Sequence, residues 1–153
     1  MSFPISYKGE FKFKSVSTLR RDISDLVLLI EDGLRKQNAK ALVHKIDSVS
    51  FKGRFYDLPK LYPLFQMISS GSIKLSEENG QLTIAYSLSF TRMFVFACAS
   101  IFVLVGLSIN KIGLQRGFSA VLIIGFLYWA MYHSSINRFD HFLKKTLQAN
   151  VAG

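Results

Sequence analysis

Two long apolar stretches near the C-terminus constrain the fold of this chain most. Residues Met93 to Ile109 contain no charged side chain, and after a short connector, Asn110 to Arg116, a second uncharged stretch runs from Gly117 to Ile136. As α-helices they would be roughly 25 and 30 Å long, close to the thickness of the hydrocarbon core of a bilayer. Backbone inside lipid must satisfy its own hydrogen bonds, and no barrel pattern is present, so each stretch must be helical. The sequence therefore predicts a transmembrane helical hairpin.

The composition of the first stretch favours its insertion. Ten of its residues are Leu, Ile, Phe or Val. Each contributes roughly 0.3 to 0.6 kcal/mol near the centre of a membrane helix, about 3 to 6 kcal/mol together. The alternative, two buried helices of a soluble protein, is disfavoured because both stretches are apolar on all sides, whereas a core helix usually keeps a polar stripe.

Charged and aromatic residues mark where each stretch would meet water. Cations bracket the two stretches, and three aromatic residues cluster at the end of the second, where amphipathic rings favour the headgroup layer. The expected anchoring residues are Arg92, Lys111, Arg116, Tyr128, Trp129, Tyr132 and Arg138.

The distribution of cations predicts the orientation. Five Lys and Arg lie close to the hairpin on the side of the two termini, against two in the connector. In membrane proteins, the cytoplasmic segments next to the spans carry more Lys and Arg than the segments on the other side of the membrane. In addition, no cleavable signal precedes the first 92 residues, which carry fourteen Lys and Arg. We expect an integral protein of the inner or plasma membrane with both termini in the cytoplasm.

The basic charge is spread along the chain and totals +9. Such a distribution suits membrane lipid as a partner, because an anionic inner leaflet attracts each nearby Lys or Arg by about 1 kcal/mol. Nucleic acid would also attract it, but the sequence contains no helix-turn-helix, zinc-finger spacing or aromatic RNA-binding signature. We expect no nucleic-acid partner.

Residues 1–90 show strand and helix patterns in alternation. Tyr7 to Lys14 is typical of a half-buried strand, and a helix with apolar positions three or four apart follows to about Gly33. Lys40 to Phe55 is rich in β-branched and aromatic residues and favours either two strands or one bent strand. Lys60 to Ser69, after a proline-containing start, indicates a short helix.

A β-hairpin completes this domain. Alternating apolar residues lead up to Asn79-Gly80, a pair that favours a tight hairpin turn, and alternate again on the way back. The returning strand runs into Phe90 and Arg92 without a flexible linker. We therefore expect the domain to be held rigidly against the membrane surface.

The whole pattern predicts an α+β fold. A small antiparallel or mixed sheet is covered by one long and one short helix, followed by a two-helix transmembrane hairpin and a C-terminal amphipathic helix. A ferredoxin-like arrangement is one version of the sheet domain. The expected divisions are a cytoplasmic domain (1–90), the hairpin (91–136, with spans 93–109 and 117–136) and an amphipathic tail (137–153). The tail either lies in the membrane interface or continues the second span and packs on the domain.

Few residues suggest a chemical site. His44, in a strand, and His133, at the end of the second span, are the two candidates, and an ordinary structural histidine is the default for both. The single cysteine, Cys98, has no partner for a disulfide and no neighbouring metal ligands. No catalytic, phosphate-binding or metal-binding motif occurs, so we expect no cofactor and no metal.

We favour a non-catalytic accessory or structural subunit that binds a larger membrane protein or a second copy of itself, because function must be argued from a site and none is evident. The first alternative is a membrane-tethered ligand-binding or sensory module with a pocket between helices and sheet. The second is a membrane-bound enzyme acting on a lipid or another hydrophobic substrate, with polar residues around His44, Tyr86 or His133.

Overall fold

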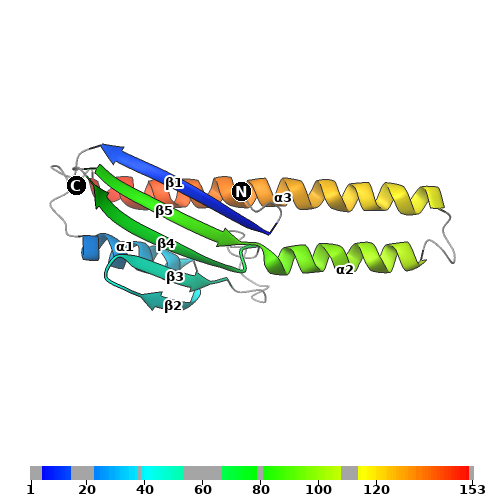
Figure 1. The fold of residues 1–153 in the computed structure, drawn as a ribbon, viewed down its shortest axis with the longest axis horizontal. Coiled ribbons are helices and arrows are strands. Elements are labelled where there is room, and N and C mark those ends of the chain that lie inside the picture. The colour runs from blue at the N-terminus through cyan, green and yellow to red at the C-terminus, as the bar shows by residue number, and fades with distance from the viewer. Residues whose placement is uncertain are drawn as a thin grey trace.

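The computed structural model describes residues 5–14, 23–37, 39–53, 67–78, 81–107 and 114–151. These residues form an α+β fold with a five-stranded antiparallel sheet and three helices (Figure 1). The strands are β1 (Ser6–Lys14), β2 (Lys40–His44), β3 (Ser48–Lys52), β4 (Ser70–Glu78) and β5 (Gln81–Ser89). The helices are α1 (Ile23–Lys36), α2 (Thr91–Leu107) and α3 (Leu114–Val151).

The sheet is a meander with one added strand. Its order is β1-β5-β4-β3-β2, so consecutive strands from β2 to β5 are neighbours and β1 pairs with β5 at the edge. For Lys40 to Phe55 the sequence left open whether one bent strand or two strands form. The structure has two, β2 and β3, and backbone hydrogen bonds join Lys45 and Ser48 across the turn between them. The ferredoxin-like arrangement is wrong, since it would place the first strand inside the sheet.

Alternation gives the sheet one apolar and one polar face. Most inward positions of β3, β4 and β5 are buried, and outward positions are mostly Ser, Thr and Lys. The inward face is covered by α1 and by the C-terminal part of α3, whose buried side chains join the same core. The buried inward residues of these three strands are Val49, Phe51, Ile73, Leu75, Leu82, Ile84, Tyr86 and Leu88.

Two strand glycines let aromatic rings lie flat on the sheet. A Cβ atom at Gly9 would overlap the ring of Tyr86, its partner on β5, and one at Gly71 would overlap the ring of Phe51, its partner on β3. Both rings then contact Phe139 of α3, at centroid distances of 5.4 Å for Tyr86 and 5.8 Å for Phe51. The glycines therefore determine how closely α3 approaches the sheet.

The C-terminal tail is not a separate helix but the continuation of α3. The second apolar stretch and the tail form one helix of 38 residues, about 57 Å long. Its last turns bury Phe139, Leu143 and Leu147 in the core of the sheet domain. Of the two arrangements expected for the tail, the described residues adopt the one in which the second span continues and packs on the domain.

Two further expectations fall partly outside the described residues. The predicted short helix, Lys60 to Ser69, lies mostly in the undescribed range 54–66, and Met67 to Ser69, which are described, are not helical. The predicted hairpin turn at residues 79–80 also lies outside. Its strands are confirmed, because Glu78 pairs with Gln81 and leaves two residues for the connection.

Beyond the sheet domain, α2 and the first half of α3 run side by side as an antiparallel pair (Figure 1). In the described part of the chain one helix is long and apolar enough to cross a membrane, over Phe118–Leu147. The sequence predicted two such spans. The structure supports one candidate span instead of two, because α2 has only 17 residues and begins with the polar pair Thr91-Arg92.

Candidate membrane-anchoring site

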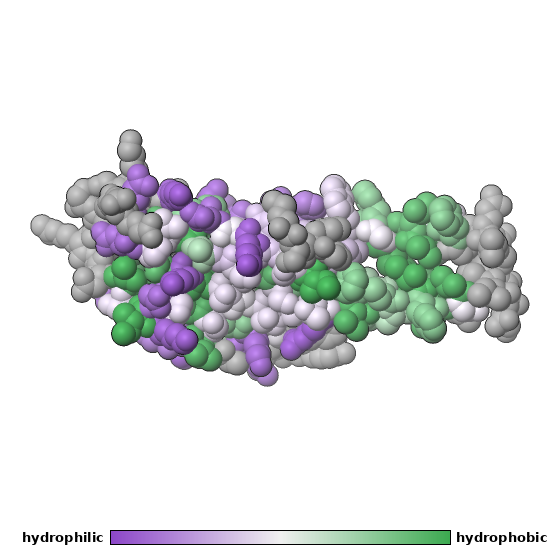
Figure 2. All heavy atoms as spheres, viewed as in Figure 1, coloured by the Kyte–Doolittle hydropathy of each residue, from purple (hydrophilic) through white to green (hydrophobic). Residues whose placement is uncertain are grey.

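The α2–α3 pair exposes apolar side chains on many sides. Figure 2 shows them covering the visible face of the pair, whereas the visible face of the sheet domain is largely polar. Phe102 is 82% exposed. Soluble monomers rarely expose a contiguous apolar patch of more than a few hundred Å². The exposed large apolar residues of the pair are Val95, Phe96, Phe102, Val103, Val105, Phe118, Leu122, Ile123, Phe126, Leu127, Trp129 and Met131.

The junction between β5 and α2 is held by hydrogen bonds from three parts of the chain. The amide of Phe90 donates to the carbonyl of Ile5 over 2.7 Å, and the amide of Arg92 donates to Oγ of Ser69 over 2.9 Å. The guanidinium of Arg92 donates to the carbonyl of Gly53 over 3.0 Å. Ser69 thus satisfies one of the amides that a helix start leaves without a partner. These contacts support the rigid junction inferred from the sequence.

Aromatic packing joins α3 to the same junction. Tyr132 is 4% exposed, its ring lies 4.7 Å from that of Phe90, and its hydroxyl donates to the carbonyl of Ser6 over 3.3 Å. One helical turn earlier, Tyr128 meets Phe94 of α2 edge-on at 6.1 Å. Tyr132 therefore packs inside the protein, Tyr128 is partly buried, and Trp129, at 50% exposed, presents its ring outward.

The predicted cationic anchors occupy different environments. Arg92 lies at the start of α2 and also binds the sheet domain through Gly53. Arg138 is exposed on α3, beyond the apolar surface. Lys111 lies outside the described residues, and of Arg116 the structure describes only the helical backbone. Arg92 and Arg138 thus lie at the domain end of the helical pair, as the sequence implied.

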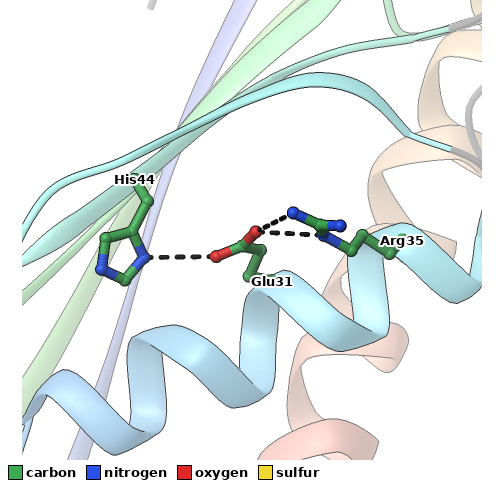
Figure 3. Close-up of polar contacts among 3 residues, drawn as sticks. All are labelled: Glu31, Arg35 and His44. Carbon is green, nitrogen blue, oxygen red and sulfur yellow. Dashed lines mark hydrogen bonds and ion pairs between the residues drawn. The ribbon is translucent and has the colours of Figure 1, made fainter.

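His44 belongs to a small polar cluster on the surface (Figure 3). Its Nδ1 lies 3.2 Å from Oε2 of Glu31 in α1, while Arg35 donates to Oε1 of the same carboxylate over 2.8 and 3.0 Å. The hydrogen bond from Arg35, assisted by that from His44, lowers the pKa of Glu31. The cluster ties β2 to α1.

His133 lies elsewhere, on the exposed side of α3. Its ring meets Trp129 edge-on at 4.8 Å and Tyr132 edge-on at 5.6 Å. Tyr86, the third residue of the enzyme hypothesis, is inside the core. The structure gives the three residues different partners, and among the described residues no three His, Cys, Asp or Glu side chains come together to hold a metal.

One polar contact of the core was missed from the sequence. Tyr86 of β5 donates its hydroxyl hydrogen to a carboxylate oxygen of Asp140 in α3, so a phenol and an acid meet between sheet and helix. Burial and the neighbouring carboxylate raise the pKa of Tyr86. The sequence did contain a signal for a specific polar contact at this position, because Asp140 is the only acidic residue after position 92.

Replacing Tyr86 with phenylalanine is expected to destabilise the protein by about 1 to 3 kcal/mol at neutral pH, because Asp140 loses a donor in a part-buried position. The difference should shrink at high pH. The raised pKa of Tyr86 means that its contribution is complete below the ordinary tyrosine pKa of 10.0 and is lost as the pH rises above it. Urea unfolding of both proteins at pH 8 and at about pH 11 measures this. A constant difference would show that the hydroxyl is not held as described.

Comparisons with protein-family models, with curated proteins and with solved structures found no match to this chain. The function is therefore argued from the helical pair, its junction and the surfaces around them.

Proposed function

We propose that this protein is a non-catalytic subunit that is anchored in the inner or plasma membrane by α2 and α3 and binds a larger membrane protein or a second copy of itself. One observation carries the proposal. The α2–α3 pair exposes apolar side chains widely and joins a polar-faced sheet domain through a hydrogen-bonded junction.

The exposed apolar side chains of both helices are best accommodated in lipid. Although α2 is only 17 residues long, about 25 Å, it lies beside α3 and shares its exposed apolar surface. A short span is accommodated by local thinning of the bilayer at a modest cost. With both helices inserted, the sheet domain and the C-terminus lie on one side, and the excess of cations there supports a cytoplasmic location for that side.

A binding role is supported by apolar residues outside the helical pair. Leu28 of α1, Val43 of β2 and Ile46 of the following turn are 53%, 56% and 82% exposed. β2 is an edge strand with an irregular register, and α1 packs beside it. An exposed apolar group at a sheet edge is typical of a protein–protein contact. We place the partner contact at this edge.

The core of the sheet domain argues against the two alternatives. Phe51, Tyr86 and Phe139 fill the space between sheet and α3, where a ligand-binding module would keep a pocket. For the enzyme hypothesis, the three named residues lie in separate places with separate partners, so no single site combines His44, Tyr86 and His133. The subunit role needs neither feature.

Co-purification with a matched pair of variants tests the proposal. We expect the full chain, extracted in mild detergent, to elute with a stoichiometric partner or as a homo-oligomer. Replacing Val43 and Ile46 with aspartate should release the partner and leave the chain in the membrane fraction. The control carries aspartate at Ser50 and Ser72, exposed positions on the polar face of the sheet, and should keep the partner. Elution as a lone monomer would contradict the subunit role.

A further inference from the structure

A basic groove opens where the apolar surface of α3 ends. It has a volume of about 720 Å³ and is shallow and open to solvent. Its floor is one side of α3, on which residues recur every three or four positions, and Gln37 at the end of α1 closes it on one side. The residues that matter for its chemistry are Trp129, His133, Asn137, Arg138, His141 and Lys145.

The charge in this groove is of one sign. Arg138 and Lys145 are exposed, and no acidic residue is among those that line the groove. The nearest acid in the sequence, Asp140, points to the other side of the helix, where it accepts the hydrogen bond from Tyr86. Within the described part of the chain, neither Arg138 nor Lys145 forms an ion pair. Among the described residues, therefore, no acidic group neutralises the two cations of the groove, and their charge favours an anion.

The position of the groove selects the kind of anion. The exposed apolar surface of α3 ends at Met131, and Arg138 follows seven residues later, about 10 Å further along the axis. Trp129, at the apolar end of the groove, is the residue type that favours the boundary between headgroups and hydrocarbon. With α3 in a bilayer, the middle of the groove falls in the layer of lipid phosphates.

From this placement we infer that the groove binds the phosphate of an anionic phospholipid headgroup, with the acyl chains of that lipid lying along α3 beside Trp129. The guanidinium of Arg138 offers paired donors that match phosphate oxygens, and Asn137 adds an amide donor. Lys145 supplies the second cation for the negative charge. The inference rests on the proposed membrane insertion of α3, and it adds a specific lipid site to it.

Trp129 is the only tryptophan of the chain and therefore reports on this groove alone. The test uses the full-length protein in phosphatidylcholine vesicles that contain a minor fraction of either phosphatidylglycerol or phosphatidylcholine with brominated acyl chains. Bromine quenches the fluorescence of a tryptophan that it touches. We expect brominated phosphatidylglycerol to quench Trp129 at a lower mole fraction than brominated phosphatidylcholine.

Single variants assign the preference to the groove. Arg138→Gln and Lys145→Gln should each reduce the preference for phosphatidylglycerol about five-fold, the factor that corresponds to the usual attraction of one cation to an anionic leaflet. Lys144→Gln is the matched control. It removes the same charge from the adjacent residue, whose ammonium lies outside the groove and 5.0 Å from the ring of Phe11. This control should keep the full preference.

The outcomes separate the inference from the proposed function. Equal quenching by the two brominated lipids, or an equal effect of Lys144→Gln, would overturn the lipid site and leave the membrane anchor standing. No quenching by either lipid would show that α3 is not in the bilayer and would overturn both. If inorganic phosphate in the aqueous phase relieves the quenching by brominated phosphatidylglycerol, the groove takes soluble phosphate, and the assignment to lipid is wrong.

Discussion

Replacing Phe139 with alanine is expected to lower the free energy of unfolding of the sheet domain by about 3 to 5 kcal/mol. This ring is completely buried, stacks on Phe51 and packs at a tilt against Tyr86, and these two rings cover the strand glycines. Since Gly71 and Gly9 have no side chains to move inward, the space left by the ring would remain a cavity. The measurement is thermal or urea unfolding of the protein in detergent.

The matched control makes the same substitution in the same helix. Phe126 is 66% exposed and lies in the part of α3 that extends beyond the sheet domain. Phe126→Ala should change the unfolding of the sheet domain by no more than about 0.5 kcal/mol, the usual range for surface substitutions. Equal losses in the two variants would contradict the packing of the C-terminal part of α3 on the sheet.

Replacing Phe102 with lysine is expected to prevent α2 from crossing the membrane. A lysine near the centre of a span costs about 2.5 to 3.5 kcal/mol, and the favourable contribution of the phenylalanine is lost as well. The apolar residues of this stretch favour insertion by only about 3 to 6 kcal/mol in total. One substitution therefore removes most of the free energy that would hold α2 in the bilayer under the proposed two-span arrangement.

Labelling of the connector between α2 and α3 measures this effect. In a Cys98→Ser background, a single cysteine introduced as Asn110→Cys is treated with a membrane-impermeant maleimide from outside intact cells. We expect strong labelling in this background and a large loss after Phe102→Lys. The control is Ser50→Lys, which places the same charge at an exposed residue on the polar face of the sheet. It should label like the background.

Two results would contradict the two-span arrangement. If the connector is not labelled before Phe102 is changed, it does not reach the outside. If the connector is labelled equally before and after Phe102→Lys, insertion of α2 is not what brings the connector to the outside.

Local periodicity predicted most of the described elements of the sheet domain. The strict alternation in β4 and β5 and the Asn-Gly pair between them predicted the central hairpin, because a two-residue period and a tight turn are properties of neighbouring residues. The apolar spacing in α1 predicted a helix whose buried residues, Leu26, Ile30 and Leu34 among them, face the sheet. The order of the strands was not predictable in this way, because pairing depends on residues distant in sequence.

The residues of the candidate site divide in the same way: some were predictable from the local sequence, and others depend on residues that only the tertiary structure brings together. The cations Arg92 and Arg138 were predicted from composition to lie at the ends of the apolar stretches, since the end of such a stretch is a local feature. The groove was not found, because its residues became a site only when α3 continued as one helix past the second stretch and Gln37 of α1 came to lie beside it. The bond between Tyr86 and Asp140 was missed for the same reason, as 54 positions separate the two residues.

The sequence by itself determined that residues 93–109 and 117–136 are strongly apolar, without a charged side chain, and that the N-terminal part forms a sheet with one apolar face. Both conclusions depend on the transfer of side chains from water, which composition and periodicity already specify. Only the tertiary structure decided that one helix serves both parts, with its first half in the exposed pair and its second half in the core of the domain. That choice depends on which surfaces fit together, and here the fit is set by aromatic rings that lie over two glycines.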